Sequence, residues 1–248
     1  MEKFKAAKGR KLHSLEAHDL LCKIGEVVVV GGVRRSAMIS LSDLSDDRMA
    51  HAKAGNWWDG QGQRALANNS AVYNTKPDVG QFMREWSNIY ESHSGERGIF
   101  NRYASELRAA KNGRRELGKE WGTNPCSEII LRPYQFCNLC EQNVSDVTSQ
   151  EDLNARAKAA AFIGTLQAGY TDFHYLRPIW QDTTEKDALL GVSMTGIGSG
   201  AILGLDLEQA AKISVEENKR IAAIIGINPA ARVTAVKPAG TTSLVVIS

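Results

Sequence analysis

Hydrophobic residues recur every three or four positions in several long stretches of the chain, a spacing that predicts helices with one buried face. One such helix starts at Ser14, whose hydroxyl can cap it, and ends in the valine run 27–30. In the stretch 78–92 the aromatic residues share one helical face, so we expect them in the core. Further helices are predicted at 46–53, 102–120, 153–176 and 207–225.

Short stretches rich in β-branched or apolar residues lie between these helices and predict strands. They cover 37–41, 66–73, 98–101, 191–196 and 232–243, the last running into a glycine turn. Strands that alternate with helices favour an α/β fold, with parallel strands covered by helices. We expect one domain over residues 1–248, with a poorly structured start at 1–12. Ligands in such folds bind at strand ends and in the loops that follow them.

Composition places the chain among ordinary globular proteins. It has 248 residues, 43% hydrophobic and 23% charged, and a formal net charge of +2. This composition argues against disorder, and so small a charge does not favour direct nucleic-acid binding. No apolar run reaches the length of a membrane span, and the first residues lack the hydrophobic core of a signal peptide. We therefore expect a cytoplasmic protein that does not bind membranes.

The segment 124–128 carries the strongest chemical signal in the chain. Asn124, Cys126 and Glu128 place an amide, a thiol and a carboxylate at alternate positions, so an extended segment would point all three side chains to one face. Burying three such groups without partners would cost roughly 1–3 kcal/mol each. The pattern is therefore typical of a catalytic site and not of a packed core.

Four cysteines are too few for a disulfide scaffold and fit a reducing compartment. Cys137 and Cys140 have the spacing of a zinc half-site or a redox dithiol. No second cysteine pair and no matching histidine spacing accompanies them, so we predict no metal site. A cytosolic dithiol protein is an alternative, although it leaves Asn124 and Glu128 unexplained. Cys22 lies at helical spacing among leucines and is expected in the core.

Two glycine-containing loops could receive phosphate groups through free backbone amides. Gly31-Gly32 opens into Val33-Arg34-Arg35-Ser36, where two arginines accompany the amides. The turn 238–243 combines small side chains and hydroxyls at the expected start of a helix. For the first loop a plain turn is the commoner explanation.

Six spaced motifs together resemble the catalytic chains of ribonucleotide reductases, most of all the adenosylcobalamin-dependent, class II enzymes. The resemblance spans residues 10–246, and several motifs in one order are far more specific than any single one. The motifs are Gly31-Gly-Val-Arg-Arg-Ser-Ala37, Asn68-Asn-Ser70, Asn124-Pro-Cys-Ser-Glu128, Cys137-Asn-Leu139, Gly191-Val-Ser-Met-Thr-Gly-Ile197 and Val236-Lys-Pro-Ala-Gly-Thr-Thr242.

The resemblance implies the central part of a ten-stranded α/β barrel, and it implies thiyl-radical chemistry with adenosylcobalamin as the radical source. Cys126 would be the thiyl cysteine that removes the 3′ hydrogen of the ribose. Glu128 would take the 3′-hydroxyl proton, and Asn124 would hydrogen-bond the sugar hydroxyls. Cys137 would be the reducing cysteine that forms a disulfide as the 2′-hydroxyl leaves as water.

The resemblance also implies the binding loops and the partners. It implies a ribonucleoside di- or triphosphate substrate, a dNTP or ATP effector and a thioredoxin-like dithiol reductant. A homodimer is one assembly that it allows. The substrate would be bound by Ser127 and the phosphate turn Pro238, Ala239, Gly240, Thr241 and Thr242, with Ala239 replacing the usual serine. The effector loop would be Gly31, Gly32, Val33, Arg34, Arg35 and Ser36, with Arg34 a candidate contact to the base.

In that family the partner of Cys137 lies on an earlier strand, which this sequence lacks. We therefore expect a fragment of such an enzyme. Two alternatives remain open: a non-catalytic fragment that binds nucleotides, and a fragment of a class I catalytic subunit, which receives its radical from a partner protein. The sequence assigns no role to Cys140.

Overall fold

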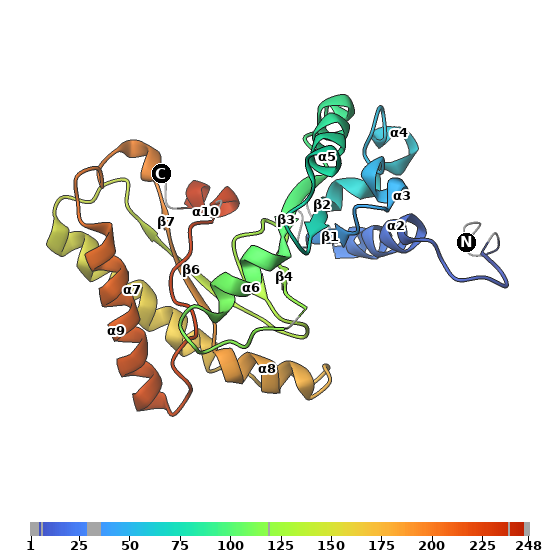
Figure 1. Cartoon of the computed structure of the whole chain (residues 1–248). Helices are drawn as coiled ribbons and strands as arrows, with labels where there is room; N and C mark the ends of the chain where they lie inside the picture. The colour runs from blue at the N-terminus through green and yellow to red at the C-terminus, as the bar shows by residue number, and fades with distance from the viewer. Residues whose placement is uncertain (1–4, 6, 29–35, 119, 238, 246–248) are drawn as a thin grey trace. The chain divides into compact units, whose positions relative to one another are not determined.

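The structure, a computed structural model, describes residues 5, 7–28, 36–118, 120–237 and 239–245 (Figure 1). The chain divides into two compact units. The first comprises Met1–Glu106 with Gly122–Ser127, and the second comprises Leu107–Trp121 with Glu128–Ser248. The expectation of one domain over 1–248 stays a prediction, and the expected poorly structured start falls partly on residues outside the described set.

The first unit is built on a parallel three-stranded sheet. Strands β1 (Met38–Ser42), β2 (Ala67–Tyr73) and β3 (Gly98–Asn101) lie in the order β1-β2-β3. Met38 of β1 pairs with Ala67, and Ser70 of β2 pairs with Gly98. The other elements that begin in this unit are α2 (Ser14–Gly25), η1 (Glu26–Val28), α3 (Asp47–Ala50), α4 (Trp58–Gln61), η2 (Gly62–Leu66), α5 (Val79–Ser92), α6 (Arg102–Ala110) and β4 (Gly122–Thr123).

The second unit pairs two parallel strands and covers one face with two long helices. Strand β6 (Asn138–Asn143) pairs with β7 (Leu190–Thr195), and a parallel bridge joins Val192 to Thr234. Helices α7 (Gln150–Ala168) and α9 (Leu207–Ile225) pack against each other beside these strands (Figure 1). The remaining elements are β5 (Ile130–Leu131), α8 (Ile179–Asp187), η3 (Ile197–Ser199) and α10 (Gly240–Val245).

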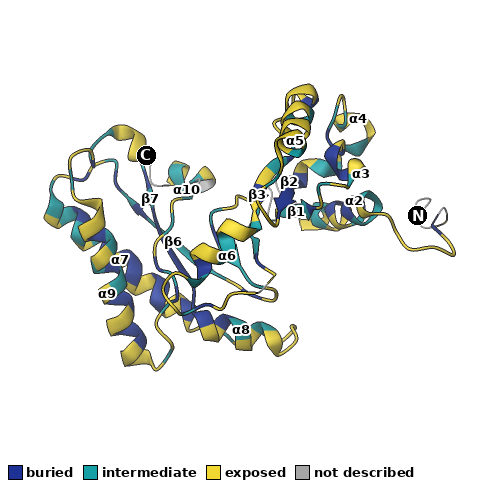
Figure 2. Cartoon of the chain, in the orientation of Figure 1, coloured by how far each residue is buried: buried dark blue, intermediate teal, exposed yellow. Residues whose placement is uncertain are grey.

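The two faces of the β6-β7 pair bury different clusters. On the helix side, Leu190 and Val192 pack with alanines of α7, and Figure 2 shows the buried faces of α7 and α9 turned toward the strands. On the other side, Leu139 packs with the buried Ile129 and Leu189. A Cβ on Gly191 would lie 2.3 Å from Leu139 Cδ2, so glycine is needed there to admit the leucine.

The parallel strands and covering helices confirm the predicted α/β class. The complete barrel stays a prediction. Most predicted elements are present with shifted ends; the helix expected at 153–176 ends at Ala168, followed by Gly169 as its C-cap. The strand expected at 232–243 was wrong: a single bridge at Thr234 represents it, and its last residues lie in α10. The helix expected at 207–225 ends as predicted, with Gly226 in the left-handed conformation at φ 76°. Cys22 is buried in α2, also as predicted.

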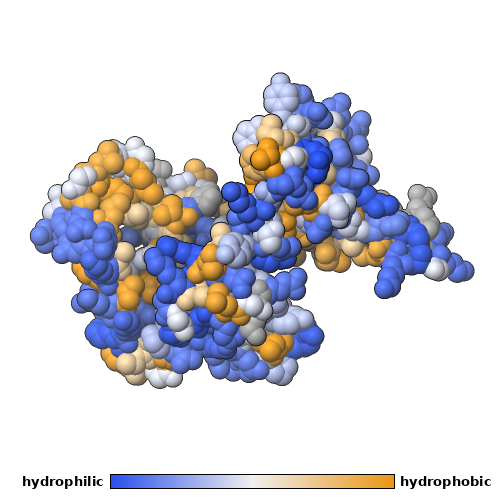
Figure 3. All heavy atoms as spheres, viewed as in Figure 1, coloured by the Kyte–Doolittle hydropathy of each residue, from blue (hydrophilic) through white to orange (hydrophobic). Residues whose placement is uncertain are grey.

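The prediction that the aromatic face of α5 packs into the core was wrong. Its aromatic residues are exposed, with Trp86 at 56% and Tyr90 at 75% (Figure 2). The buried residues of α5 are Glu85 and Ser92, and the Glu85 carboxylate accepts two hydrogen bonds from the buried Arg97 at 2.9 and 2.7 Å. An ion pair therefore determines which face of α5 is buried. Apolar side chains reach the surface in both units among charged ones (Figure 3).

Candidate functional site

The segment around Cys126 is a turn, so the predicted strand with three side chains on one face is wrong. The backbone N–H of Ser127 donates to the Asn124 carbonyl at 3.0 Å, which closes a four-residue turn. Pro125 occupies the second position, where its fixed φ favours a turn. Ser127 has φ 67°, in the left-handed region that only glycine adopts freely. The turn leaves Cys126 exposed.

A side chain from strand β2 holds this turn. The Asn68 carboxamide donates to the carbonyl of Pro125, the residue before Cys126, at 2.6 Å. The next residue along β2, the buried Asn69, accepts a hydrogen bond from His18 Nε2 at 2.9 Å through its side-chain oxygen. Sequence reasoning included Asn68 in a motif and assigned it no role. Its contact with Pro125 joins residues 57 positions apart, which no local pattern can reveal.

The four candidate catalytic residues are divided between the two units. Asn124 and Cys126 belong to the first, and Glu128 and Cys137 belong to the second. Glu128 is half-buried, and its Oε2 atom is buried with no hydrogen-bond partner among the described residues. A carboxylate oxygen in this state is available to accept a proton or a hydrogen bond from a ligand.

Burial protects three of the four thiols from ionisation. It raises the pKa of Cys22, Cys137 and Cys140 to about 11 each. For Cys137 the negative charge of Glu128 raises the pKa further. These thiols are therefore protonated at neutral pH, which makes them weak nucleophiles but keeps the S–H hydrogen in place.

Cys137 and Cys140 face different surroundings. Cys137, just before β6, packs with the cluster of Ile129, Leu189 and Ala231. Cys140 lies three positions later in the strand, and its thiol donates to the Ala160 carbonyl of α7 at 3.2 Å. Residues an odd number of positions apart in a strand point to opposite faces. The arrangement therefore argues against a dithiol made of these two cysteines.

A buried ion cluster centred on Asp187 holds the segment between Glu128 and Cys137. Asp187, fully buried at the end of α8, accepts hydrogen bonds from Arg115, Arg132 and Gln135 at 2.7–3.1 Å. Arg115 also donates to the Ile130 carbonyl at 2.9 Å and to Gln135 Oε1 at 2.8 Å.

The same cluster includes a tryptophan. Both guanidinium groups lie near the ring of the buried Trp121, with Arg115 at 4.3 Å and Arg132 at 5.4 Å from its centroid. Burial lowers the pKa of Arg115 to about 10 despite the neighbouring carboxylate of Asp187. The cluster fixes three backbone segments, so it sets where Glu128 and Cys137 lie within the second unit.

A second buried ion pair precedes the candidate phosphate turn. Lys237 pairs with Glu141 of β6, and the Lys237 backbone N–H donates to Ser193 Oγ at 3.3 Å. Helix α10 begins at Gly240, and the Ser243 N–H donates to the Ala239 carbonyl at 2.9 Å. A helix therefore starts at the predicted place. Pro238 and the effector-loop residues Gly31 to Arg35 lie outside the described residues, while Ser36 donates to the Gly25 carbonyl at 3.3 Å.

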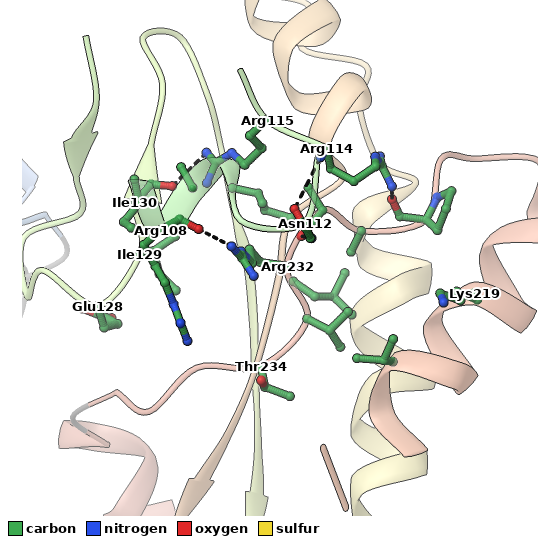
Figure 4. A pocket seen from close by; sticks show the side chains of 18 residues that line it. Arg108, Asn112, Arg114, Arg115, Glu128, Ile129, Ile130, Lys219, Arg232 and Thr234 are labelled. Atoms are coloured by element: carbon green, nitrogen blue, oxygen red, sulfur yellow. Dashed lines mark hydrogen bonds between the residues drawn. The ribbon is translucent and has the colours of Figure 1, made fainter. Parts of the chain in front are cut away.

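A cavity of about 640 Å³ lies in the second unit (Figure 4). Glu128 lies at one side of it in this view, Arg232 and Asn112 near its centre, and Lys219 at the other side. The cavity also borders Arg108, Arg114 and Arg115. Sequence reasoning missed it, because its walls come from segments more than 100 positions apart.

The described part of the chain contains neither a cluster of metal ligands nor a helix suited to span a membrane. No group of three or more histidine, cysteine or acidic residues there could hold a metal ion. No described helix is both long and apolar enough to cross a membrane.

The similar proteins include adenosylcobalamin-dependent ribonucleoside-triphosphate reductases from several bacteria. The chain is 31% identical over 199 residues to the adenosylcobalamin-dependent ribonucleoside-triphosphate reductase of Lacticaseibacillus paracasei, a match that covers 76% of this chain and 25% of the relative. It is 28% identical over 275 residues to the enzyme of the same name from Lactobacillus acidophilus, covering 94% of this chain and 35% of the relative. No model of a protein family matches the chain.

A solved structure shares the fold. The crystal structure of a B12-dependent, class II ribonucleotide reductase superposes with a TM-score of 0.69 at 24% sequence identity. The match covers 95% of this chain and 36% of the solved chain. The chain thus spans about a quarter to a third of the length of the proteins it matches.

Proposed function

Because the chain belongs to the ribonucleotide reductase family and is most like its adenosylcobalamin-dependent members, we propose that it supplies the central chemistry of ribonucleotide reduction. The substrate is a ribonucleoside di- or triphosphate, and the relatives' names favour the triphosphate. In the net reaction the ribose loses its 2′-hydroxyl as water, the carbon gains a hydrogen, and two thiols are oxidised to a disulfide.

Cys126 carries the radical in this proposal. When bound, adenosylcobalamin supplies the radical that converts the Cys126 thiol into a thiyl. The exposed position of Cys126 on its turn fits this use, because a buried thiol could be reached neither by a cofactor nor by the ribose. The Asn68 hydrogen bond to Pro125 keeps the turn in one place. No described residue is assigned to hold the cofactor.

Glu128 accepts the proton in this proposal, and Cys137 supplies the reducing hydrogen. The proposal rests on the hydrogen-bonding state of the Glu128 carboxylate and on the protonation of the Cys137 thiol. Glu128 Oε2 is buried without a partner, so it can take the 3′-hydroxyl proton while the thiyl removes the 3′ hydrogen. The raised pKa of Cys137 keeps its thiol protonated, ready to give hydrogen as the 2′-hydroxyl leaves as water.

The remaining roles concern binding. Asn124 and Ser127 would hydrogen-bond the sugar, and the phosphates would lie on the turn from Pro238 to Thr242. The loop from Gly31 to Ser36 would respond to a dNTP or ATP effector. A thioredoxin-like dithiol would restore the thiols, and the assembly could be a homodimer.

A second candidate is nucleotide binding without turnover. It is favoured by the place of Cys140, which is bonded to Ala160 on the opposite face of β6 from Cys137. Cys137 and Cys140 are the two cysteines of the second unit. Because Cys140 lies on the opposite face of the strand, this unit offers Cys137 no thiol with which to form a disulfide.

One experiment separates the two functions. The purified chain is incubated with a ribonucleoside triphosphate, adenosylcobalamin and dithiothreitol, and deoxyribonucleotide is quantified alongside nucleotide affinity. Reduction predicts product in the wild type and at least a 100-fold lower rate in Glu128→Gln, since loss of general base catalysis costs about 10²–10⁴-fold. Binding without product would establish the second candidate instead.

A further inference from the structure

Many cations in the second unit are paired with a carboxylate, and several are not. Arg115, Arg132, Arg156, Lys186, Lys212, Arg220 and Lys237 each lie within ion-pair distance of a carboxylate. Other cations of the unit make no such pair with any described residue, and four of these are Arg108, Arg114, Lys219 and Arg232. All four border the single 640 Å³ cavity described above.

Arg232 shows the electrostatic cost of this arrangement. Its guanidinium is half-buried and donates to the backbone carbonyl of Arg108, a neutral acceptor. Burial lowers the pKa of Arg232, and the nearby charge of Arg108 lowers it further. The charge of the exposed Arg108 thus lies near a partly desolvated guanidinium of the same sign, and an anion between them would offset the repulsion.

Arg115 of the cavity is paired with Asp187, but Arg114 and Lys219 pair with no described carboxylate. Arg114 donates to the carbonyls of Pro229 at 2.7 Å and Lys186 at 3.3 Å, and Lys219 lies on the wall formed by α9 (Figure 4). Glu128 is the one carboxylate among the residues that border the cavity, and it lies at the far side from Lys219 (Figure 4).

We propose that this cavity binds an oligophosphate anion, free or carried by a nucleotide, between Arg108, Arg232 and Lys219. A cavity of about 640 Å³ has the size of small-molecule sites, and a chain of phosphates can reach cations that do not converge on one point. Guanidinium groups bind phosphate oxygens in pairs, with strong charge-assisted hydrogen bonds.

This site is distinct from the proposed substrate-phosphate turn. Neither Ala239 nor Gly240 nor Thr242 borders the cavity. The inference does not depend on radical chemistry, so it can hold or fail independently of the proposed reductase function.

The test is calorimetric titration of the full chain with tripolyphosphate, followed by ATP and by adenosine. Arg232→Gln and Lys219→Gln should each weaken tripolyphosphate binding by about tenfold or more, since each removes a charged contact. Arg220→Gln is the matched control: it removes the same charge from α9, outside the cavity and beside Glu217, and should leave affinity unchanged within about twofold. Thermal unfolding of each variant checks that it is folded.

The ligand series identifies the source of the phosphates. Equal affinity for tripolyphosphate and ATP assigns the site to the phosphate chain alone, and tighter ATP binding assigns it to a nucleotide; both support the proposal. Absence of tripolyphosphate binding overturns it. So does binding that survives both Arg232→Gln and Lys219→Gln but is lost in Thr242→Val, because the anion would then lie at the turn.

Discussion

Neutralising Asp187 should destabilise the protein more than any other single charge removal in the second unit. Asp187 has no exposed surface, and its two guanidinium partners are 1% and 8% exposed at the side chain. In Asp187→Asn the side chain keeps its shape, but Arg115 and Arg132 remain buried beside Trp121 without a counter-charge. Removing one partner of a buried ion pair costs about 3–5 kcal/mol, a large share of a typical total stability of about 5–15 kcal/mol.

The assay is urea unfolding followed by circular dichroism, with the free energy of unfolding extrapolated to zero denaturant. Asp146→Asn is the control: its carboxylate is 70% exposed and pairs with Arg156, so its loss should cost less than about 1 kcal/mol. Adding Arg132→Met to Asp187→Asn should recover part of the lost free energy of unfolding, because it removes one buried cation that has no counter-charge. A loss below about 1 kcal/mol in Asp187→Asn alone would refute the reasoning.

Three further predictions follow from other contacts. At pH 8 iodoacetamide should alkylate Cys126 much faster than the other three cysteines, whose pKa burial raises to about 11; mass spectrometry would show this, and equal rates would contradict it. Asn68→Ala should lower the free energy of unfolding by about 1 kcal/mol in urea titrations through loss of the bond to Pro125; an unchanged midpoint would show that the bond contributes nothing. Gly191→Ala should cost about 1–3 kcal/mol, since its Cβ would lie 2.3 Å from Leu139 Cδ2. Leu139→Ala in the same chain should relieve that strain, and additive losses would argue against it.

The sequence predicted the elements because helices and strands follow from local periodicity. The α9 helix, for example, ends at the predicted residue, where Gly226 takes the left-handed conformation. The orientation of α5 could not be predicted, because it depends on the pairing of Glu85 with Arg97. Amphipathic periodicity identified its two faces but not which one is covered.

The geometry of the candidate site could not be predicted from the sequence, and the roles of its residues stay a prediction. The alternation at 124–128 suggested a strand, yet Pro125 and the Ser127 N–H bond to Asn124 make a turn. The Asp187 cluster joins residues 55 and 72 positions apart, and the cavity joins Arg108 to Arg232. Such contacts depend on tertiary folding, so a single sequence gives no signal for them.

The most direct test of the central claim compares two cysteine variants in the turnover assay. Cys126→Ala should abolish deoxyribonucleotide formation in the presence of adenosylcobalamin and dithiothreitol while leaving nucleotide affinity unchanged. Cys140→Ala, which removes a thiol bonded to Ala160 away from the proposed chemistry, should keep most of the wild-type rate. Product formation at the wild-type rate in Cys126→Ala would contradict the assignment of Cys126 as the radical cysteine.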